Sequence, residues 1–156
     1  MLHIALWEPE IPPNTGNIAR LCAATGTRLH LIGKLGYELS DKQLKRAGLD
    51  YWPLVDIHVH PTWEAFLEVI GSARLWLIDN PAPRSVYDTT FRQDDVLLFG
   101  KESTGLPEWL KEQYAGQMID VPIRPNTVRS LNLSTTAGIV LYEALRQVNF
   151  NGVEIG

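Results

Sequence analysis

The sequence predicts an α/β fold in which a mostly parallel β-sheet is flanked by helices. Short apolar runs alternate along the chain with segments whose apolar residues recur at helical spacing. The apolar runs have no polar face, which is typical of parallel strands that helices cover on both sides. The 156 residues, 45% of them hydrophobic, are enough for a full-sized core, and we expect residues 1–156 to form a single domain.

The predicted elements follow one another with turn residues between them. Strands are expected at residues 2–7, 28–33, 54–59, 74–79, 95–99 and 117–122. Helices are expected at residues 16–25, 41–47, 62–70, 107–114 and 132–148. A capping box of Ser40 with Gln43 starts the second helix, and Gly48 ends it. In the last helix one broad apolar stripe, from Leu133 to Val148, indicates core packing, and part of it is wide enough to face a second subunit.

The composition excludes several classes of protein. Charged residues make up 21% of the chain, an ordinary globular value, so disorder is not expected. No apolar run reaches about 18 residues, which excludes a transmembrane helix. The chain start has no basic region and reaches Glu8 too early for a signal peptide, so we interpret it as a strand of a cytoplasmic protein. Cys22 is the only cysteine, which excludes an intrachain disulfide, and its apolar helix face indicates a buried structural thiol.

The charge is unevenly distributed along the chain. The formal net charge of −4 argues mildly against indiscriminate nucleic-acid binding. Residues 1–49 are nevertheless net positive. Their basic residues are Arg20, Arg28, Lys34, Lys42, Lys45 and Arg46, and their acidic residues are Glu8, Glu10, Glu38 and Asp41. This distribution is compatible with a local phosphate-binding face in the N-terminal third.

Three polar loops follow predicted strands and lead into helices, and ligands of α/β sheets bind at that edge. The first loop spans residues 8–17, where prolines stiffen the chain and Gly16 permits a turn or a close ligand contact. Asn14, Asn17 and Arg20 would supply directional donors. A rigid turn with an asparagine cap is the competing interpretation. Arg20 favours a functional site, because a cation at a helix start opposes the helix dipole.

The second loop, residues 100–107, resembles a P-loop only superficially. Lys101 is followed by Glu102 where that motif requires Ser or Thr, and Asp95 stands where it requires Gly. The glycines around Glu102 favour backbone that wraps closely around a ligand, and a plain strand-to-helix connection explains them equally well. No loop contains G-x-G-x-x-G, so a dinucleotide-binding fold is disfavoured.

The third loop, from Arg129 to Ser134, is the polar entrance to the last helix. One N-cap residue would start this helix, yet Ser130, Asn132 and Ser134 all crowd its first turn. Redundant donors at a helix N-terminus favour a bound polar or anionic small molecule. We therefore expect a ligand site here.

The histidine and tryptophan patterns favour structural roles. For His58 and His60, on one face of a predicted strand, we favour edge-strand or core histidines over a metal site, since no cysteine or acidic partner accompanies them. The five tryptophans are dispersed, which indicates packing. Trp52 beside Tyr51 is the exception, because a basic helix precedes them and such a group can hold phosphates and stack bases. A solvated helix face is the favoured alternative there.

Taken together, the loops resemble the three motifs of the SPOUT superfamily of RNA methyltransferases, and most closely its small TrmL (YibK-type) group. The resemblance covers nearly the whole chain. It rests, in order, on the segments EPEIPPNTGNIARLCAATG, DKQLKRAGLDYW, LLFGKESTGLP and RSLNLSTTAGIVLYEALRQ.

The resemblance implies an activity and a fold. Members of the group transfer a methyl group from S-adenosyl-L-methionine to the ribose 2′-hydroxyl of the tRNA wobble nucleotide, cytidine or uridine 34, in the anticodon stem-loop. Their C-terminal segment threads a loop to form a deep trefoil knot, in which the methyl donor lies. The group acts in the cytoplasm as a homodimer, and no metal is implied.

Carried onto this chain, the resemblance implies two sets of site residues. The catalytic-motif positions are Asn14, Arg20, Glu102, Ser130 and Asn132. The donor-binding positions are Ile78, Gly100, Val121, Ser130 and Leu131. Within the dimer, Arg20 would reach a donor bound by the other subunit.

The chain departs from the family pattern in three places. The turn at Asp79–Pro83 replaces a small, hydroxyl-rich turn, the loop from Pro122 to Ser130 is one residue longer, and Thr135 replaces an asparagine. Two other functions stay open beside the one that the resemblance implies. One is 2′-O-methylation at another tRNA or ribosomal RNA position, and the other is a non-catalytic RNA-binding module with the same fold.

Overall fold

The computed structural model describes the whole chain except residues 41, 43, 45, 47–50, 151–152 and 155–156. Most of the helix predicted at 41–47, together with Gln43 and Gly48 at its predicted ends, lies outside the described residues. The basic segment before Tyr51 falls there in large part as well.

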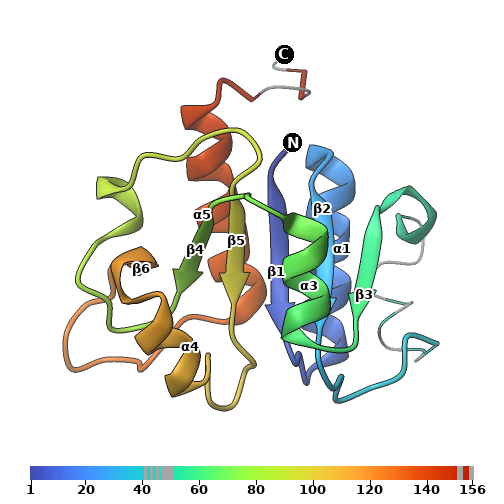
Figure 1. Cartoon of the computed structure of the whole chain (residues 1–156), viewed down its shortest axis with the longest axis horizontal. Coiled ribbons are helices and arrows are strands. Elements are labelled where there is room, and N and C mark those ends of the chain that lie inside the picture. The colour runs from blue at the N-terminus through green and yellow to red at the C-terminus, as the bar shows by residue number, and fades with distance from the viewer. Residues whose placement is uncertain (41, 43, 45, 47–50, 151–152, 155–156) are drawn as a thin grey trace.

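Six parallel strands form one sheet in the order β3-β2-β1-β5-β4-β6 (Figure 1). The strands are β1 (His3–Trp7), β2 (Arg28–Ile32), β3 (Ile57–His60), β4 (Leu75–Ile78), β5 (Val96–Phe99) and β6 (Met118–Ile119). The predicted α/β class with a parallel sheet is confirmed. Because all strands are parallel, the loops after β1, β4, β5 and β6 leave from one edge of the sheet, the carboxyl edge.

Helices cover both faces of the sheet (Figure 1). They are α1 (Pro12–Thr25), α3 (Trp63–Ile70), α4 (Glu108–Gln113) and α5 (Leu133–Gln147), and short 3-10 helices lie at η1 (Trp52–Leu54), η2 (Val86–Asp88) and η3 (Ala115–Gln117). Alternate residues of β1 show the two layers. Ile4 packs in the core cluster of α1 and α5, whereas Ala5 packs in the cluster that contains Phe66 of α3 and Leu110 of α4. The predicted core role of the last helix is thereby confirmed.

Three predicted elements had wrong bounds, and one of them is the strand expected at 117–122, of which only Met118–Ile119 is a strand. Helix α1 begins at Pro12 instead of residue 16, because its two prolines occupy the first helical turn, where a missing N–H needs no partner. Gly16 is consequently a buried helical residue, not a turn residue, and Arg20 lies in mid-helix. The third strand begins at Ile57 instead of residue 54, since η1 precedes it.

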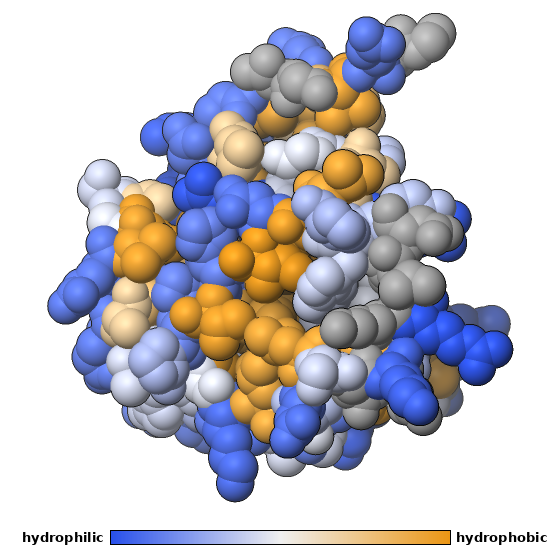
Figure 2. Space-filling model, turned by 90° about the vertical axis from the view of Figure 1, so that its right-hand side faces the viewer, coloured by the Kyte–Doolittle hydropathy of each residue, from blue (hydrophilic) through white to orange (hydrophobic). Residues whose placement is uncertain are grey.

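Cys22 is buried, as predicted, and burial raises the pKa of its thiol. Among the described helices none has the length and apolar character that a bilayer crossing requires. At the β3 side of the molecule, Figure 2 shows apolar side chains in the middle of the visible face. Leu54 and Val59, from η1 and β3, are the exposed apolar residues of that region.

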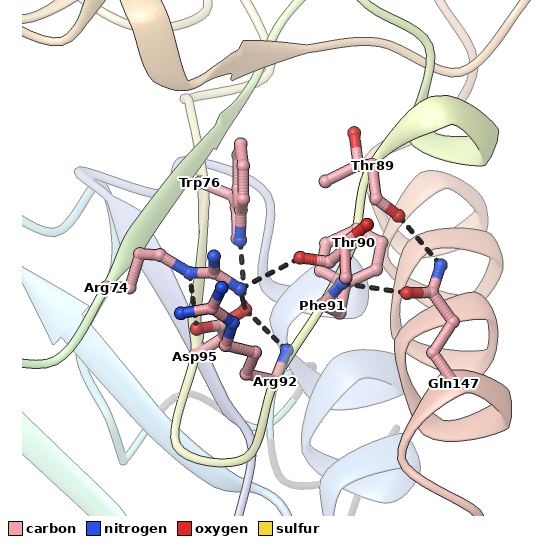
Figure 3. Close-up of polar contacts among 8 residues, drawn as sticks. All are labelled: Arg74, Trp76, Thr89, Thr90, Phe91, Arg92, Asp95 and Gln147. Atoms are coloured by element: carbon pink, nitrogen blue, oxygen red, sulfur yellow. Dashed lines mark hydrogen bonds and ion pairs between the residues drawn. The ribbon is translucent and has the colours of Figure 1, made fainter.

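A buried carboxylate organises the amino edge of the sheet, opposite the carboxyl edge (Figure 3). Asp95, only 2% exposed, accepts hydrogen bonds from Nε and Nη2 of Arg74 (3.0 and 2.7 Å) and from Nε1 of Trp76 (3.0 Å). It also accepts one from the backbone N–H of Arg92 (2.9 Å). Beside it, the Gln147 side chain ties the end of α5 to the segment at residues 89–91. The cluster connects β4, β5 and α5 far from the polar loops.

Candidate functional site

A pocket of about 490 Å³ opens at the carboxyl edge of the sheet. The residues that end or follow β4, β5 and β6 form its walls, and the loop that enters α5 closes it. It therefore lies where the sequence predicted that the polar loops converge.

Eight of the nine site residues that the resemblance implies line this pocket. They are Asn14, Ile78, Gly100, Glu102, Val121, Ser130, Leu131 and Asn132. Arg20 does not line it. Its side chain is exposed on α1, with the guanidinium carbon 4.9 Å from the centre of the Tyr51 ring.

Glu102 binds the start of α1. Its Oε2 accepts a hydrogen bond from the backbone N–H of Glu10 (2.8 Å), and its Oε1 accepts one from that of Ile11 (3.2 Å). Ile11 is the N-cap residue of α1 and has no capping side chain, so the carboxylate of Glu102 supplies an acceptor that the helix lacks. A negative charge at this position also complements the helix dipole.

A directed chain of hydrogen bonds runs from Glu102 to the start of α5, and we call it the amide relay. Asn14 Nδ2 donates to Glu102 Oε1 (3.5 Å), and Asn132 Nδ2 donates to Asn14 Oδ1 (3.1 Å). Asn132 Oδ1 then accepts from the backbone N–H groups of Ser134 (2.9 Å) and Thr135 (3.3 Å).

Both ends of the amide relay determine its direction. A carboxylate only accepts and a backbone N–H only donates. If either asparagine amide flipped, exchanging its oxygen and nitrogen, two acceptors or two donors would face each other. Asn132 is thus the N-cap residue of α5 and also holds Asn14. Asn132, one of the polar residues crowded before this helix, therefore both caps the helix and forms part of the pocket wall.

Glu10 and Glu102 form a reciprocal contact between two loops. While Glu102 accepts from the backbone of Glu10, Oε1 of Glu10 accepts from the backbone N–H (2.9 Å) and the hydroxyl (2.6 Å) of Ser103. Hydrogen bonds from Ser103 lower the pKa of the Glu10 carboxyl, which therefore stays ionised at neutral pH. The loops after β1 and β5 are held together by this exchange.

The loop after β5 folds back onto itself at two glycines. A Cβ on Gly100 would lie 2.1 Å from the carbonyl carbon of Gly105, so no larger residue fits there. Gly105 has φ +72°, and a Cβ on it would lie 2.9 Å from Oδ2 of Asp79. The close neighbours of both glycines are protein atoms, and that these glycines wrap the backbone around a ligand stays a prediction.

Basic residues stand in the pocket wall. Lys101, Lys111 and Arg129 all line it, and the Lys101 ammonium lies 3.0 Å from Oε1 of Glu8. Lys111 lies 2.8 Å from Glu108 and 3.7 Å from Asp79, and the hydrogen bond with Glu108 is the main reason why the pKa of its ammonium is raised. The pocket can thus accept a ligand with an anionic group.

Asp79, Asn80 and Lys111 are pocket residues that were not among the predicted site residues. The position of Asp79 and Asn80 directly after a predicted strand was the available signal, because that is where the ligand edge of a parallel sheet lies. Trp52, for which base stacking was the less favoured interpretation, is partly buried and packs against the core.

The histidines are structural, as predicted. They line up on neighbouring strands, with 2.9 Å between His3 Nδ1 and His30 Nε2 and again between His30 Nδ1 and His60 Nε2. The described residues contain no group of three or more His, Cys, Asp or Glu side chains that could hold a metal ion. The dispersed tryptophans also pack, and Trp7, Trp63 and Trp109 contact one another edge to face.

Comparisons with known proteins agree with the geometry of this pocket. A tRNA (cytidine(34)-2′-O)-methyltransferase from Methylovorus glucosotrophus is 48% identical over 153 residues, which are 97% of this chain and 99% of that protein. A structure solved for work on the 2-OH methylation of C/U34 on tRNA superposes with a TM-score of 0.91 at 48% identity, covering 96% of this chain and 97% of the other.

A more distant neighbour is the AdoMet-bound rRNA methyltransferase from Sinorhizobium meliloti, with a TM-score of 0.83 at 25% identity. It aligns with 94% of this chain over 56% of its own length. The model of the SpoU rRNA Methylase family matches residues 1–142. With a parallel sheet, a pocket at its carboxyl edge and this match over most of its length, the chain belongs to the SpoU rRNA methylase family.

Proposed function

We propose that this protein is a tRNA 2′-O-methyltransferase. It transfers a methyl group from S-adenosyl-L-methionine to the ribose 2′-hydroxyl of the wobble nucleotide, cytidine or uridine 34. The observation that carries the proposal is the pocket at the carboxyl edge, where eight of the nine expected site residues meet. The identity of 48% over nearly the whole chain with the Methylovorus enzyme supports the same substrate.

The pocket fits the methyl donor. Its volume of about 490 Å³ lies in the range of small-molecule sites, roughly 300–1,000 Å³. Ile78, Phe99 and Val121 offer apolar surface for a heterocycle, and Lys111 and Arg129 offer charge for a carboxylate. Ile78, Gly100, Val121, Ser130 and Leu131 are the residues that would hold the donor. When bound, the donor supplies a methyl group on a positively charged sulfur.

The catalytic and positioning residues in this proposal are, together, Asn14, Arg20, Glu102, Ser130 and Asn132. The 2′-hydroxyl must lose its proton, and a guanidinium with a pKa above about 12 is a poor proton acceptor. We therefore assign Arg20 to stabilising the developing negative charge on the 2′-oxygen and to anchoring a phosphate. Asn14 and Ser130 orient the reacting groups.

Glu102 is assigned a positioning role. Both of its carboxylate oxygens accept hydrogen bonds from the start of α1, and Oε1 also accepts from Asn14. An oxygen that already accepts from backbone donors is a weak candidate for taking a proton from the ribose. Its contribution is to hold Asn14, and through it the amide relay, in one orientation.

The proposal includes a homodimer, with residues 1–156 as one domain, in the cytoplasm. The place of Arg20 supports it, because this side chain lies outside the pocket of its own protomer. A second copy would bring it to the site. The tRNA would bind through its anticodon stem-loop.

A trefoil knot at the C-terminal end is also proposed. The chain after β6 stays close to the segment after β4, where the carbonyl of Asp120 accepts from the backbone N–H of Val86 (2.7 Å) and Asp120 Oδ2 accepts from that of Ala82 (3.0 Å). It then leads through the pocket wall to α5. These contacts fit a segment that is threaded through a loop.

Transfer of tritium from labelled S-adenosyl-L-methionine to unmodified tRNA, followed by nucleotide mapping, tests the function. We expect label at ribose 34 only. Label at another tRNA position, or in ribosomal RNA alone, would show that the enzyme methylates that RNA position and not nucleotide 34. Donor binding without incorporation into any RNA would identify a binding module instead of an enzyme.

A further inference from the structure

The turn after β4 forms part of the pocket wall, and the proposed mechanism assigns no role to its side chains. It starts with Asp79 and Asn80, and both line the pocket. The Asp79 side chain is 18% exposed, so its carboxylate is largely enclosed by the protein. An enclosed carboxylate is costly unless several donors or cations satisfy it.

Asp79 is satisfied by the loop after β5. Its Oδ2 accepts a hydrogen bond from the backbone N–H of Leu106 (3.2 Å), and Lys111 of α4 lies 3.7 Å from the same oxygen. Its Oδ1 accepts from the backbone N–H of Asn80 (2.8 Å). The absence of a Cβ on Gly105 is what lets the loop approach this carboxylate. Asp79 thus holds the end of the loop that begins at Gly100.

Asn80 is directed to the opposite wall. Its Nδ2 donates to the carbonyl of Val121 (3.3 Å), in the segment that follows β6. The backbone supports the same connection, since the N–H of Asp79 donates to the carbonyl of Ile119 (3.2 Å). Two consecutive side chains therefore reach two different segments of the pocket, at Leu106 and at Val121.

We propose that Asp79 and Asn80 are positioning residues for the methyl donor: they hold the Gly100–Leu106 loop and the Val121 segment at the separation that the donor requires. The inference rests on the proposed function, because it takes the pocket to be the donor site. Neither residue needs to touch the reacting atoms. Their effect should fall on donor affinity and leave tRNA recognition unchanged.

The test compares Asp79→Ala, Asp79→Asn and Asn80→Ala in the full chain, by calorimetric titration with S-adenosylhomocysteine. Loss of a hydrogen bond to a charged group can change the affinity for the ligand about tenfold. We expect Asp79→Ala to raise the Kd about tenfold, Asn80→Ala to raise it about threefold by loss of a neutral hydrogen bond, and Asp79→Asn to raise it by less than Asp79→Ala, because its single amide oxygen still accepts from one of the two backbone N–H groups that Asp79 binds. Asp88→Ala, on exposed η2, is the matched control and should bind normally.

Kinetics separate positioning from a general loss of structure. In Asp79→Ala we expect a higher KM for the donor, with kcat at saturating donor and KM for tRNA near wild type. Amide exchange should accelerate at Gly105–Leu106 and stay unchanged in β1. A wild-type Kd for Asp79→Ala, an equal loss in Asp79→Asn, or faster exchange throughout β1 would overturn the inference. A wild-type protein that binds no donor would instead overturn the proposed function.

Discussion

At the scale of single residues, hydrogen-bonding capacity decides what each side chain can do. Glu102 lines the pocket, yet its oxygens accept from the start of α1 and from Asn14. Arg20 is exposed, and its guanidinium carbon lies 4.9 Å from the centre of the Tyr51 ring. The hydrogen bonds of Glu102 therefore favour a positioning role for this carboxylate, although it lines the pocket.

The first prediction concerns Arg20→Lys. A lysine presents one compact ammonium in place of the planar guanidinium fork, so we expect kcat to fall at least about tenfold. The donor Kd should not change, because the proposed role of Arg20 is toward the 2′-oxygen and a phosphate of the tRNA and not toward the donor. Single-turnover methylation and calorimetry measure the two quantities. Arg92→Lys, at the amino edge, is the control, and near-normal turnover of Arg20→Lys would refute a role for the planar group.

At the scale of elements, the starts of two helices are coupled. The first turn of α1 is capped by a residue of another loop, Glu102, and the first turn of α5 by its own Asn132. The amide relay joins these two caps through Asn14. Helices α1 and α5 pack against each other in the same core cluster, so the relay sits at the end of an existing helix contact.

The second prediction separates the two functions of Asn132, capping α5 and holding Asn14. Asn132→Asp keeps a good N-cap oxygen for α5 but places an acceptor against the acceptor of Asn14. We expect thermal stability near wild type and methylation reduced at least about tenfold. Asn132→Ala loses the cap as well, which should lower the free energy of unfolding by about 1 kcal/mol. If Asn132→Asp methylates normally, the relay has no part in the reaction.

At the scale of the whole molecule, the two edges of the parallel sheet are specialised. The carboxyl edge carries the pocket, and the amino edge carries the buried Asp95 cluster (Figure 3). On the α3 face, the row of His3, His30 and His60 links β1, β2 and β3 next to Phe66. Residues that are remote from the site therefore contribute to stability.

The third prediction concerns Asp95. Asp95→Asn leaves the Arg74 guanidinium without its buried anionic partner, which should lower the free energy of unfolding by about 3 kcal/mol. Asp94→Asn is the neighbouring control, because the ion pair of Asp94 with the N-terminus is exposed and should be worth less than about 1 kcal/mol. Urea unfolding measures both variants. Equal effects at the two positions would show that the buried pair has no special weight.

The fourth prediction concerns pH. Burial, together with the neighbouring histidines, lowers the pKa of His30 to about 3, while an unfolded histidine has a pKa near 6.5. As the pH falls below 6.5, the unfolded chain therefore binds a proton at His30 that the folded chain excludes. The stability that neutral His30 contributes above pH 6.5 is lost as the pH falls toward 3.

Lowering the pH from 7.5 to 5 should lower the free energy of unfolding by about 2 kcal/mol through His30. Urea unfolding at both pH values measures this difference. His30→Gln removes the titrating group and should flatten the dependence, whatever its stability at pH 7.5. An unchanged slope in His30→Gln would show that other groups govern the acid loss.

Much of the fold and the site could be predicted from local information. The parallel sheet, the buried Cys22 and the long core helix α5 follow from apolar periodicity, which each segment carries by itself. Eight of the nine site residues that the motifs predicted line the pocket. The start of α1 was missed, because the stabilising acceptor for its first turn is Glu102, 91 residues away from Ile11.

What the sequence alone determined is the set of segments: which runs are buried, which loops are polar, and which motifs they carry. The tertiary structure decided how these segments contact one another. Asp79 reads as an ordinary turn residue until Leu106 is brought to its carboxylate, and Asn132 as an ordinary cap until Asn14 meets its amide. The physical reason is that apolar periodicity and capping are local, whereas a hydrogen bond between distant residues exists only after the strands have paired and brought its donor and acceptor together.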